Sequence, residues 1–304
     1  MSIADIAQTL RTRVSGRVTQ DASLAPFTTF RVGGPAHVLL EAESVDDLRA
    51  LADLRGDLPL AIVGRGSNLL VSDDGFRGFA IRLGRAFRTH ELEAEHVLRL
   101  GGAVQLPAAA RLTARFGLTG FEFAAEIPAT FGGAVRMNAG AHNRSMADVL
   151  LSAEVIDLSS GQSRAVDVED LSYGYRSSSL GNDEIVTGGT IRLEPEDSSV
   201  VAERISGYLR WRRENQPPGR SAGSIFKNPP QDSAGRLIDE AGAKGMRIGG
   251  AEVSQVHANF IVADPTASAD DVWSLIWSVH ALVKDRSGVD LEPEVRFLGE
   301  FARR

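Results

Sequence analysis

A serine in a glycine-flanked turn is the residue of this chain best placed to do chemistry. Residues 221–229 read SAGSIFKNP, so Ser224 directly follows Gly223. A serine that hands a proton to a bound substrate needs backbone room beside it, and glycine leaves that room. Read alone, the segment is equally consistent with an ordinary entry into a strand.

Two distant segments supply a guanidinium and a carboxylate to act with this serine. Arg176 ends the run YGYR, and its planar fork suits a carboxylate, although a surface salt bridge is the alternative. Glu294 lies in an expected strand over residues 291–297, on the same face as Glu292 and opposite Val295. The alternative for Glu294 is a solvent-facing carboxylate. The three groups thus come from three distant parts of the chain.

A glycine-rich loop offers a place for a phosphorylated ligand. Between two apolar runs lie Gly64, Arg65, Gly66, Ser67 and Asn68. The glycines allow successive N–H groups to face one anion, and the serine and asparagine add donors, so a diphosphate would suit the loop. A plain hairpin turn is the alternative. The loop is not a dinucleotide fingerprint, because Leu69 replaces the last glycine, and it lacks the Walker lysine.

A second stretch rich in small residues can bring backbone close to a flat or phosphorylated ligand. Gly132 and Gly133 allow that approach, and Asn138, Ala139 and Gly140 would continue the surface. Close helix packing is the alternative for the two glycines.

Three ring side chains near the C-terminus favour structural roles. His257 precedes an apolar run, and the chain has neither cysteine nor an H-E-x-x-H motif. We therefore interpret it as a hydrogen-bonding or packing residue and expect no metal site. Trp273 and Trp277, four residues apart, indicate helix packing rather than a stacking platform.

The elements that must position these residues alternate between helix and strand. Apolar spacing and capping serines predict helices within residues 1–20 and at residues 44–54, 106–116, 200–214, 234–241 and 268–283. Short apolar runs predict strands at residues 58–63, 69–71, 79–83, 97–100, 153–158, 184–193, 260–263 and 291–297. This pattern is α/β or α+β. The run QPPG at residues 216–219 breaks a helix and marks the main domain boundary.

Composition limits the class of protein. A chain of 304 residues predicts two or three domains, and its net charge of −7 argues against a general nucleic-acid binder. The negative net charge does not exclude a local basic pocket. The candidate residues for such a pocket are Arg210, Arg212, Arg213 and Arg220. The absence of cysteine excludes disulfides, thiolate metal sites and a cysteine nucleophile. With no signal peptide and no apolar run long enough to span a membrane, we expect a cytoplasmic protein.

Taken in order, these motifs resemble one family, the UDP-N-acetylenolpyruvoylglucosamine reductases, which are flavoenzymes of peptidoglycan precursor synthesis. The resemblance covers nearly the whole chain. Its motifs lie at residues 28–35, 63–68, 127–134, 137–141, 173–176, 222–229, 247–251, 256–260 and 291–299. Several motifs in the same order are far more specific than any one of them.

The resemblance implies an α+β fold and a bound cofactor. A two-part FAD-binding module of the vanillyl-alcohol-oxidase type would occupy residues 1–85 and 86–216, and an α+β substrate domain would occupy residues 217–304. FAD would be held without a covalent bond. The matching positions are Gly64, Arg65, Gly66, Ser67, Asn68, Thr130, Gly132, Gly133, Asn138, Ala139 and Gly140.

The resemblance also implies a reaction. NADPH would reduce FAD, and a hydride would then pass from flavin N5 to C3 of UDP-N-acetylglucosamine-enolpyruvate, giving UDP-N-acetylmuramate. Ser224 matches the proton donor to C2, while Arg176 and Glu294 match the groups that hold and polarise the substrate carboxylate. Glu294 helps only when protonated, because a bare carboxylate repels the developing negative charge. Substrate contacts are implied for Lys227, Asn228, Arg213 and Tyr175.

Two departures from the family pattern stand out. Ala129 occupies a position where the family motif has glycine, which adds a methyl group close to the expected flavin. The stretch from Arg176 to Gly188 lacks room for the tyrosine-bearing loop of one subgroup. The chain therefore resembles the subgroup without that loop, in which Arg213 or Arg220 would cover the UDP diphosphate.

Two other functions compete with this interpretation. Another FAD oxidoreductase of the same superfamily would share the Gly64 and Gly132 motifs but has no reason to keep Ser224, Arg176 and Glu294 together. A non-catalytic nucleotide-sugar or flavin-binding protein would bind its ligand without turnover. The expected protein is an enzyme, a monomer or weak dimer, with no nucleic-acid or membrane partner.

Overall fold

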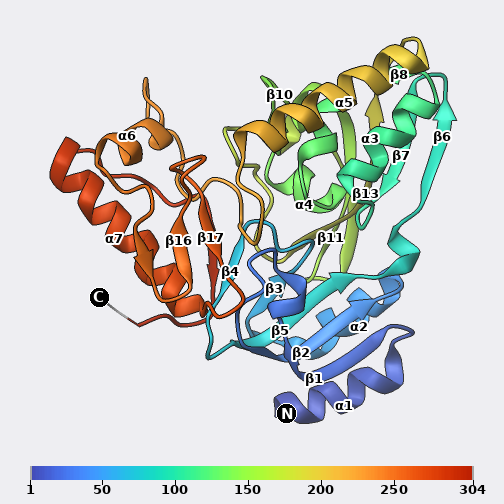
Figure 1. The fold of residues 1–304 in the computed structure, drawn as a ribbon. Helices are drawn as coiled ribbons and strands as arrows, with labels where there is room; N and C mark the ends of the chain where they lie inside the picture. Colours follow the sequence, from blue (N-terminus) through green and yellow to red (C-terminus); the bar gives the residue numbers. More distant parts are fainter. Residues whose placement is uncertain (1, 303–304) are drawn as a thin grey trace. The chain divides into compact units, whose positions relative to one another are not determined.

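A computed structural model describes residues 2–302, which form two compact units that interleave along the sequence (Figure 1). The first unit contains the segment up to Gln20, Val38–Arg65 and Gly78–Arg212. The second unit contains Asp21–His37, Gly66–Arg77 and the segment from Arg213 on. The chain passes from the first unit to the second for the last time between Arg212 and Arg213, close to the expected break at residues 216–219. The three-domain division of the chain stays a prediction.

A four-stranded sheet carries the N-terminal part of the chain. Its strand order is β1 (Arg17–Ser23), β2 (Pro35–Ala42), β5 (Phe76–Leu83) and β3 (Leu60–Ile62), with β3 parallel to β5. Helices α1 (Ile3–Arg13) and α2 (Val45–Arg55) pack against each other. Ser44 caps α2 by accepting a hydrogen bond from the amide of Asp47, which confirms the predicted helix start.

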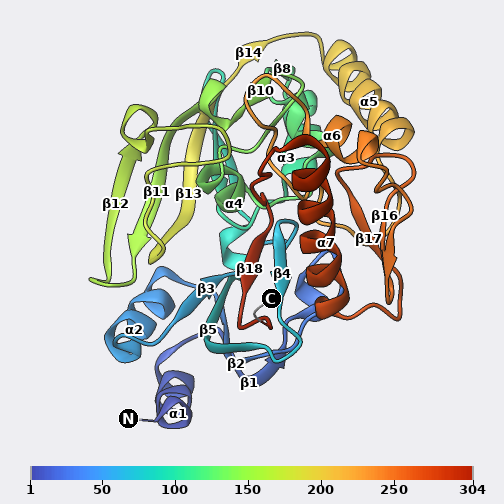
Figure 2. The same ribbon diagram turned by 90° about the vertical axis from the view of Figure 1, so that its left-hand side faces the viewer.

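A five-stranded antiparallel sheet forms the rest of the first unit, and Figure 2 shows β11 lying between its partners β12 and β13. Its order is β12 (Gln162–Asp167), β11 (Leu150–Asp157), β13 (Glu184–Arg192), β7 (Val97–Gly101) and β6 (His90–Ala94). The edge strands β6 and β12 were not predicted. Almost all of their residues are exposed, so they carry no apolar alternation.

Helices cover the core of this sheet. They are α3 (Leu106–Arg115), α4 (Phe131–Arg136) and α5 (Ser198–Asn215). Short pairs are β8 (Leu118–Thr119) with β14 (Glu194–Pro195), and β9 (Gly140–Ala141) with β10 (Arg144–Ser145). Single 3-10 turns lie at Ala25–Phe27, Arg85–Phe87, Glu122–Glu126, Met146–Asp148 and Val168–Leu171.

The second unit packs helices on a small antiparallel sheet, with α7 lying along β16 and β17 in Figure 1. The sheet consists of β15 (Arg247–Ile248), β16 (Ala251–Val253) and β17 (Ile261–Ala263), and the helices are α6 (Ala234–Glu240) and α7 (Ala269–Ser287). Ser268 begins α7 with a capping box. The rings of Trp273 and Trp277 meet edge to face with centroids 5.4 Å apart, which confirms the packing interpretation.

A parallel strand pair joins early and late parts of the chain within the second unit. Strand β4 (Leu69–Val71) pairs with β18 (Arg296–Leu298), and Figure 2 shows the two side by side. The expected strand over residues 291–297 is therefore mostly wrong, because only Arg296–Leu298 is regular strand. Pro293 lacks an amide hydrogen for a ladder and forms a single bridge to Phe226. The face predicted for Glu294 from strand alternation has no basis in the structure.

Among residues 2–302, no helix is both long and apolar enough to cross a membrane.

Candidate active site

The loop from Gly64 to Asn68 is not a hairpin turn. The strand before it, β3, pairs with β5, whereas the strand after it, β4, pairs with β18. Gly66 has φ +60°, and a Cβ there would lie 2.2 Å from the carbonyl oxygen of Phe27. Only glycine therefore suits this position, and the loop is a specific backbone feature rather than a generic connection.

The loop leaves a run of backbone donors without acceptors. Within the part of the chain that the structure describes, the amides of residues 64–68 donate to no other group. Of these residues Gly66 is buried, Arg65 is exposed and the others are half-buried, so a ligand can reach the loop. Five consecutive amides that donate to no protein group suit an anionic ligand with several oxygens. The loop is therefore compatible with a bound diphosphate, and its contact with FAD stays a prediction.

A small pocket in the first unit adjoins this loop. Its volume is about 70 Å³, and it opens beside the N-terminus of α4. The expected flavin residues that line it are Gly64, Arg65, Thr130, Gly132 and Gly133. Residues that the sequence did not single out also line it, namely Arg82, Arg88, Gln105, Arg136 and Glu184. These came from separate elements and carried no recognisable motif.

The charges around the pocket favour an anion. Arg82 pairs with Glu41 at 3.3 Å, and Arg65 donates to the side chain of Gln105 at 3.2 Å. Burial lowers the pKa of Arg82, and the neighbouring charges of Arg88 and Arg65 lower it further although Glu41 opposes them. Arginines close enough to influence one another create positive potential, which a diphosphate would neutralise.

Thr130 and the two glycines after it shape the pocket wall. The Thr130 hydroxyl caps α4 by accepting from the amide of Gly133 at 3.3 Å. A Cβ on Gly132 would lie 2.7 Å from the Val186 carbonyl, so this glycine serves close packing of α4 on the sheet. A Cβ on Gly133 would meet only the Thr130 hydroxyl, at 3.3 Å. Close packing therefore accounts for Gly132, whereas the approach of a ligand to Gly133 stays a prediction.

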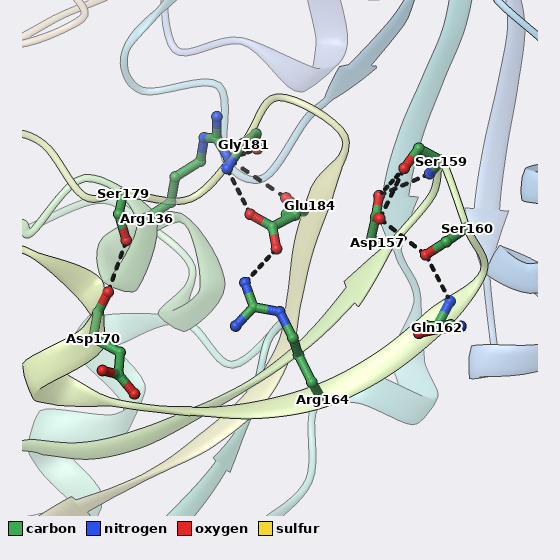
Figure 3. Close-up of polar contacts among 10 residues, drawn as sticks. All are labelled: Arg136, Asp157, Ser159, Ser160, Gln162, Arg164, Asp170, Ser179, Gly181 and Glu184. Carbon is green, nitrogen blue, oxygen red and sulfur yellow. Dashed lines mark hydrogen bonds and ion pairs between the residues drawn. The ribbon is translucent and has the colours of Figure 1, made fainter.

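Arg136 is fixed at the edge of the pocket by the turn before β13. Its guanidinium donates to the Gly181 carbonyl at 2.7 Å and to Asn182 Oδ1 at 3.1 Å. In Figure 3, Glu184 lies between Gly181 and Arg164, accepting from the amide of the first and the guanidinium of the second, both at 2.6 Å. These hydrogen bonds hold the charged side chains at the edge of the pocket in place, and they need no ligand to do so.

Asn138, Ala139 and Gly140 do not line the pocket that the structure describes. The Asn138 carboxamide donates to the Gly174 carbonyl at 3.1 Å and accepts from the Ala147 amide at 3.0 Å. The Gly140 carbonyl accepts from Arg176 at 2.9 Å. This stretch supports the Arg176 turn, and its contact with FAD stays a prediction.

Arg176 lies in a strained turn of the first unit. Its φ is +54°, and its guanidinium carbon lies 5.0 Å from the centre of the Tyr175 ring, which is 57% exposed. Tyr173 holds the turn against α4, because its hydroxyl donates to the Val135 carbonyl at 2.8 Å. Burial raises the pKa of that hydroxyl, so it keeps its proton for this bond. The turn thus presents an anchored guanidinium.

Ser224 and Glu294 lie on adjacent segments of the second unit. The Glu294 amide donates to the carbonyl of Ile225 at 2.7 Å, and the Glu294 carbonyl accepts from the Asn68 side chain at 3.1 Å. Gly223 has φ +75°, and a Cβ there would meet no atom within 4 Å. The structure therefore brings Ser224 near Glu294 and leaves open space beside the serine. Arg176 belongs to the other unit.

Two of the expected substrate contacts in the second unit already have partners. The Lys227 ammonium pairs with Glu292, and Asn228 Oδ1 accepts from the Ala234 amide at 3.1 Å at the start of α6. Arg213 is exposed. His257 accepts a hydrogen bond from the Asn259 amide at 3.2 Å, and its ring lies 4.7 Å from that of Phe260. Its predicted structural role is confirmed.

A glycine loop with unpaired amides, a capped helix start and a rim of arginines define a site for a phosphorylated cofactor on an α+β scaffold. A model described as an FAD binding domain matches residues 36–167, so the class of protein is an FAD-binding flavoprotein. The C-terminal domain of UDP-N-acetylenolpyruvoylglucosamine reductase matches residues 214–298. The chain belongs to the UDP-N-acetylenolpyruvoylglucosamine reductase family, as the sequence resemblance predicted.

Individual relatives show how far the similarity extends. UDP-N-acetylenolpyruvoylglucosamine reductase of Moorella thermoacetica is 41% identical, with 99% of each chain covered. The protein of that name from Bacillus subtilis is 38% identical over 97% of this chain and 98% of its own. The crystal structure of UDP-N-acetylenolpyruvylglucosamine reductase (MurB) from Thermus caldophilus has a TM-score of 0.83 and 38% identity, covering 93% of this chain and all of that one.

A more distant likeness concerns the fold alone. The protein Physcomitrella patens BBE-like 1 has a TM-score of 0.57 at 11% identity, covering 92% of this chain and 88% of that one. The expected α+β fold, in which an FAD-binding domain precedes a C-terminal domain of the reductase kind, is confirmed by the family models and by the Thermus caldophilus structure.

Proposed function

We propose that this protein reduces UDP-N-acetylglucosamine-enolpyruvate to UDP-N-acetylmuramate, with FAD as cofactor and NADPH as hydride donor, in peptidoglycan precursor synthesis. One observation carries the proposal. Within the part that matches the reductase C-terminal domain, a serine with open space beside it and a glutamate lie on hydrogen-bonded segments. An FAD enzyme of another kind would need no such pair.

The chain's own residues would hold the cofactor and manage charge. When bound, FAD carries a hydride from NADPH to C3 of the enolpyruvyl group. The loop of residues 64–68 would bind the diphosphate through its unpaired amides, and Thr130 with Gly133 would border the cofactor at the start of α4. Asn138, Ala139 and Gly140 would continue this contact.

Ser224 would supply the proton that completes the reduction. A hydride arriving at C3 leaves negative charge on C2, and a serine hydroxyl is acidic enough for so basic a carbon. A positioned proton donor typically contributes about 10²–10⁴-fold in rate. The open side at Gly223 gives the substrate access to the hydroxyl. Lys227 next to it would lower the cost of the alkoxide that remains.

Arg176 and a protonated Glu294 would hold the substrate carboxylate while charge develops on it. The Arg176 guanidinium is anchored by its hydrogen bond to the Gly140 carbonyl, so it needs little reorganisation during the reaction. Donors fixed in this way stabilise developing charge most effectively. Arg213, Asn228 and Tyr175 would contact the UDP-sugar, and Arg220 is the other candidate for its diphosphate. No residue equivalent to the tyrosine loop is proposed, since the chain lacks room for it.

The enzyme would act in the cytoplasm as a monomer or weak dimer, without a metal, nucleic-acid or membrane partner. Substrate-dependent oxidation of NADPH by the purified FAD-loaded protein tests the function. Oxidation that requires UDP-N-acetylglucosamine-enolpyruvate supports the reductase. Oxidation indifferent to that substrate would point to another flavin oxidoreductase, and no oxidation with FAD bound would favour a binding protein.

A further inference from the structure

Asn259 is a buried side chain bound to the backbone two residues after Ser224. It is 3% exposed, and its Oδ1 accepts from the Phe226 amide at 2.9 Å while its Nδ2 donates to the Phe226 carbonyl at 2.8 Å. A carboxamide that meets one residue's amide and carbonyl together replaces the partner strand that this segment lacks.

The backbone of Asn259 adds a third bond to the same segment. Its carbonyl accepts from the Ile225 amide at 2.9 Å, and its own amide donates to His257 Nδ1 at 3.2 Å. Ser224 itself forms a bridge with Phe260, the next residue. Three consecutive residues starting at Ser224 are thus tied to the Asn259–Phe260 segment.

The opposite edge of the serine segment faces Glu294. The Ile225 carbonyl accepts from the Glu294 amide at 2.7 Å, and the Lys227 amide donates to the Glu292 carbonyl at 2.9 Å. The serine segment lies in no regular helix or strand. Core packing of Ile225 and Phe226 holds the segment in the second unit, and these few hydrogen bonds set its register between the two flanking segments. The Asn259 side chain makes two of them.

We propose that Asn259 is a positioning residue that sets the place of Ser224 relative to Glu294 for proton transfer to the substrate. The inference rests on the proposed function, because it assigns Asn259 an effect on the step in which Ser224 acts. A side chain that places a reacting group to within about 1 Å can change a rate about 10²-fold without touching the substrate.

Asn259→Asp separates this role from general loss of structure. The ionised aspartate cannot donate to the Phe226 carbonyl, whereas the protonated form restores a donor and an acceptor in the same shape. In the FAD-loaded full chain, we expect reoxidation of the reduced flavin by the enolpyruvyl substrate to be about 10–100-fold slower at neutral pH. The rate should recover as pH falls.

The other ionisable groups around Asn259 are the same in the variant and in the wild type. His257 contacts its amide, and Glu292, Glu294 and Lys227 flank the other edge of the serine segment. The recovery is therefore measured as the ratio of variant to wild-type rate at each pH. Asn143→Asp is the matched control, because Asn143 is an exposed asparagine outside the site, and its ratio should stay near one.

Flavin reduction by NADPH and the melting temperature complete the test. We expect reduction to be unchanged in Asn259→Asp, since the residue acts only on the second half-reaction. If the variant does not fold, Asn259→Gln keeps both hydrogen-bonding groups but shifts the segment, and the same selective slowing is expected. A ratio near one at every pH would overturn the role of Asn259 alone. A wild-type flavin that the substrate does not reoxidise would overturn the proposed function as well.

Discussion

The amide of Glu294 donates a hydrogen bond to the carbonyl of Ile225 across 2.7 Å. The residue after Ser224 is therefore bonded directly to the backbone of the residue that carries the candidate carboxyl group. Neither residue's motif contains the other, and the two lie about seventy positions apart in the sequence. The proposed acid and the proposed carboxylate ligand therefore share one local framework, and a change at either should affect the same half-reaction.

Ser224→Ala should slow flavin reoxidation by the enolpyruvyl substrate by about 10²–10⁴-fold, because it removes the proton donor to C2. Flavin reduction by NADPH should stay near the wild-type rate. Rapid mixing of reduced enzyme with substrate, followed by flavin absorbance, measures the first rate. Reoxidation at wild-type speed would mean that another group is the acid.

Glu294→Gln should also slow reoxidation severely, because glutamine cannot supply the proton shared with the substrate carboxylate. The backbone bonds from Glu294 to Ile225 and Asn68 do not involve its side chain, so the fold should be retained. Both half-reactions are measured on the same preparation. A defect confined to NADPH binding would refute the role given to Glu294.

Gly66→Ala should abolish FAD binding. The added methyl would lie 2.2 Å from the Phe27 carbonyl, and φ +60° disfavours alanine, so the loop must change shape. The bound flavin per chain after purification is the readout. Gly207→Ala is the control, since that glycine lies in α5 with no atom within 4 Å of the new carbon. It should keep FAD and gain roughly 1 kcal/mol of helix stability.

Asp47→Asn should destabilise the first unit by about 2–3 kcal/mol near neutral pH, because a carboxylate that accepts several donors is lost. Asp47 accepts from the amides of Ser15, Gly16 and Glu43 and from the hydroxyls of Ser15 and Ser44. Although burial alone would raise its pKa, the backbone bonds from Glu43 and Ser15 and the serine hydroxyls hold it below the ordinary 3.8.

The sign of the pH effect follows from that lowered pKa. The stabilisation is fully present above about 3.8, the pKa expected in the unfolded chain, and is lost as pH falls through the lower folded value. Denaturant unfolding of wild type and Asp47→Asn should therefore converge only in strong acid. If the difference in unfolding free energy between the two proteins did not depend on pH, the charge of Asp47 would not be the source of the stabilisation.

Local signals made much of the fold predictable. Ser44 and Ser268 mark helix starts that depend only on neighbouring residues, and both are confirmed. Strand β12 escaped prediction because its side chains are mostly exposed. The pairing of β4 with β18 escaped because nothing in either short segment specifies so distant a partner.

The residues of the candidate site likewise differ in whether the sequence alone makes them recognisable. Gly66 was recognisable because a bent backbone demands glycine there. Arg82 and Arg88 reach the pocket from separate elements and carry no motif of their own. Asn259 was visible only as part of a motif, since its importance depends on Phe226, a residue 33 positions earlier.

The β4–β18 pair also governs when this protein can fold. Leu69–Val71 cannot form its strand pair until Arg296–Leu298 has been synthesised. The hydrogen bond from the Ser72 hydroxyl to the Glu300 carbonyl depends on late residues in the same way. A ribosome adding about 5–20 residues per second would need roughly ten seconds or more to make the intervening chain. During synthesis, the apolar residues Phe30, Val32 and Leu70 have no core to enter, because their neighbours in the second unit are still unmade. Nascent chains of this enzyme should therefore depend on chaperones, and the second unit should be the last part to gain resistance to protease.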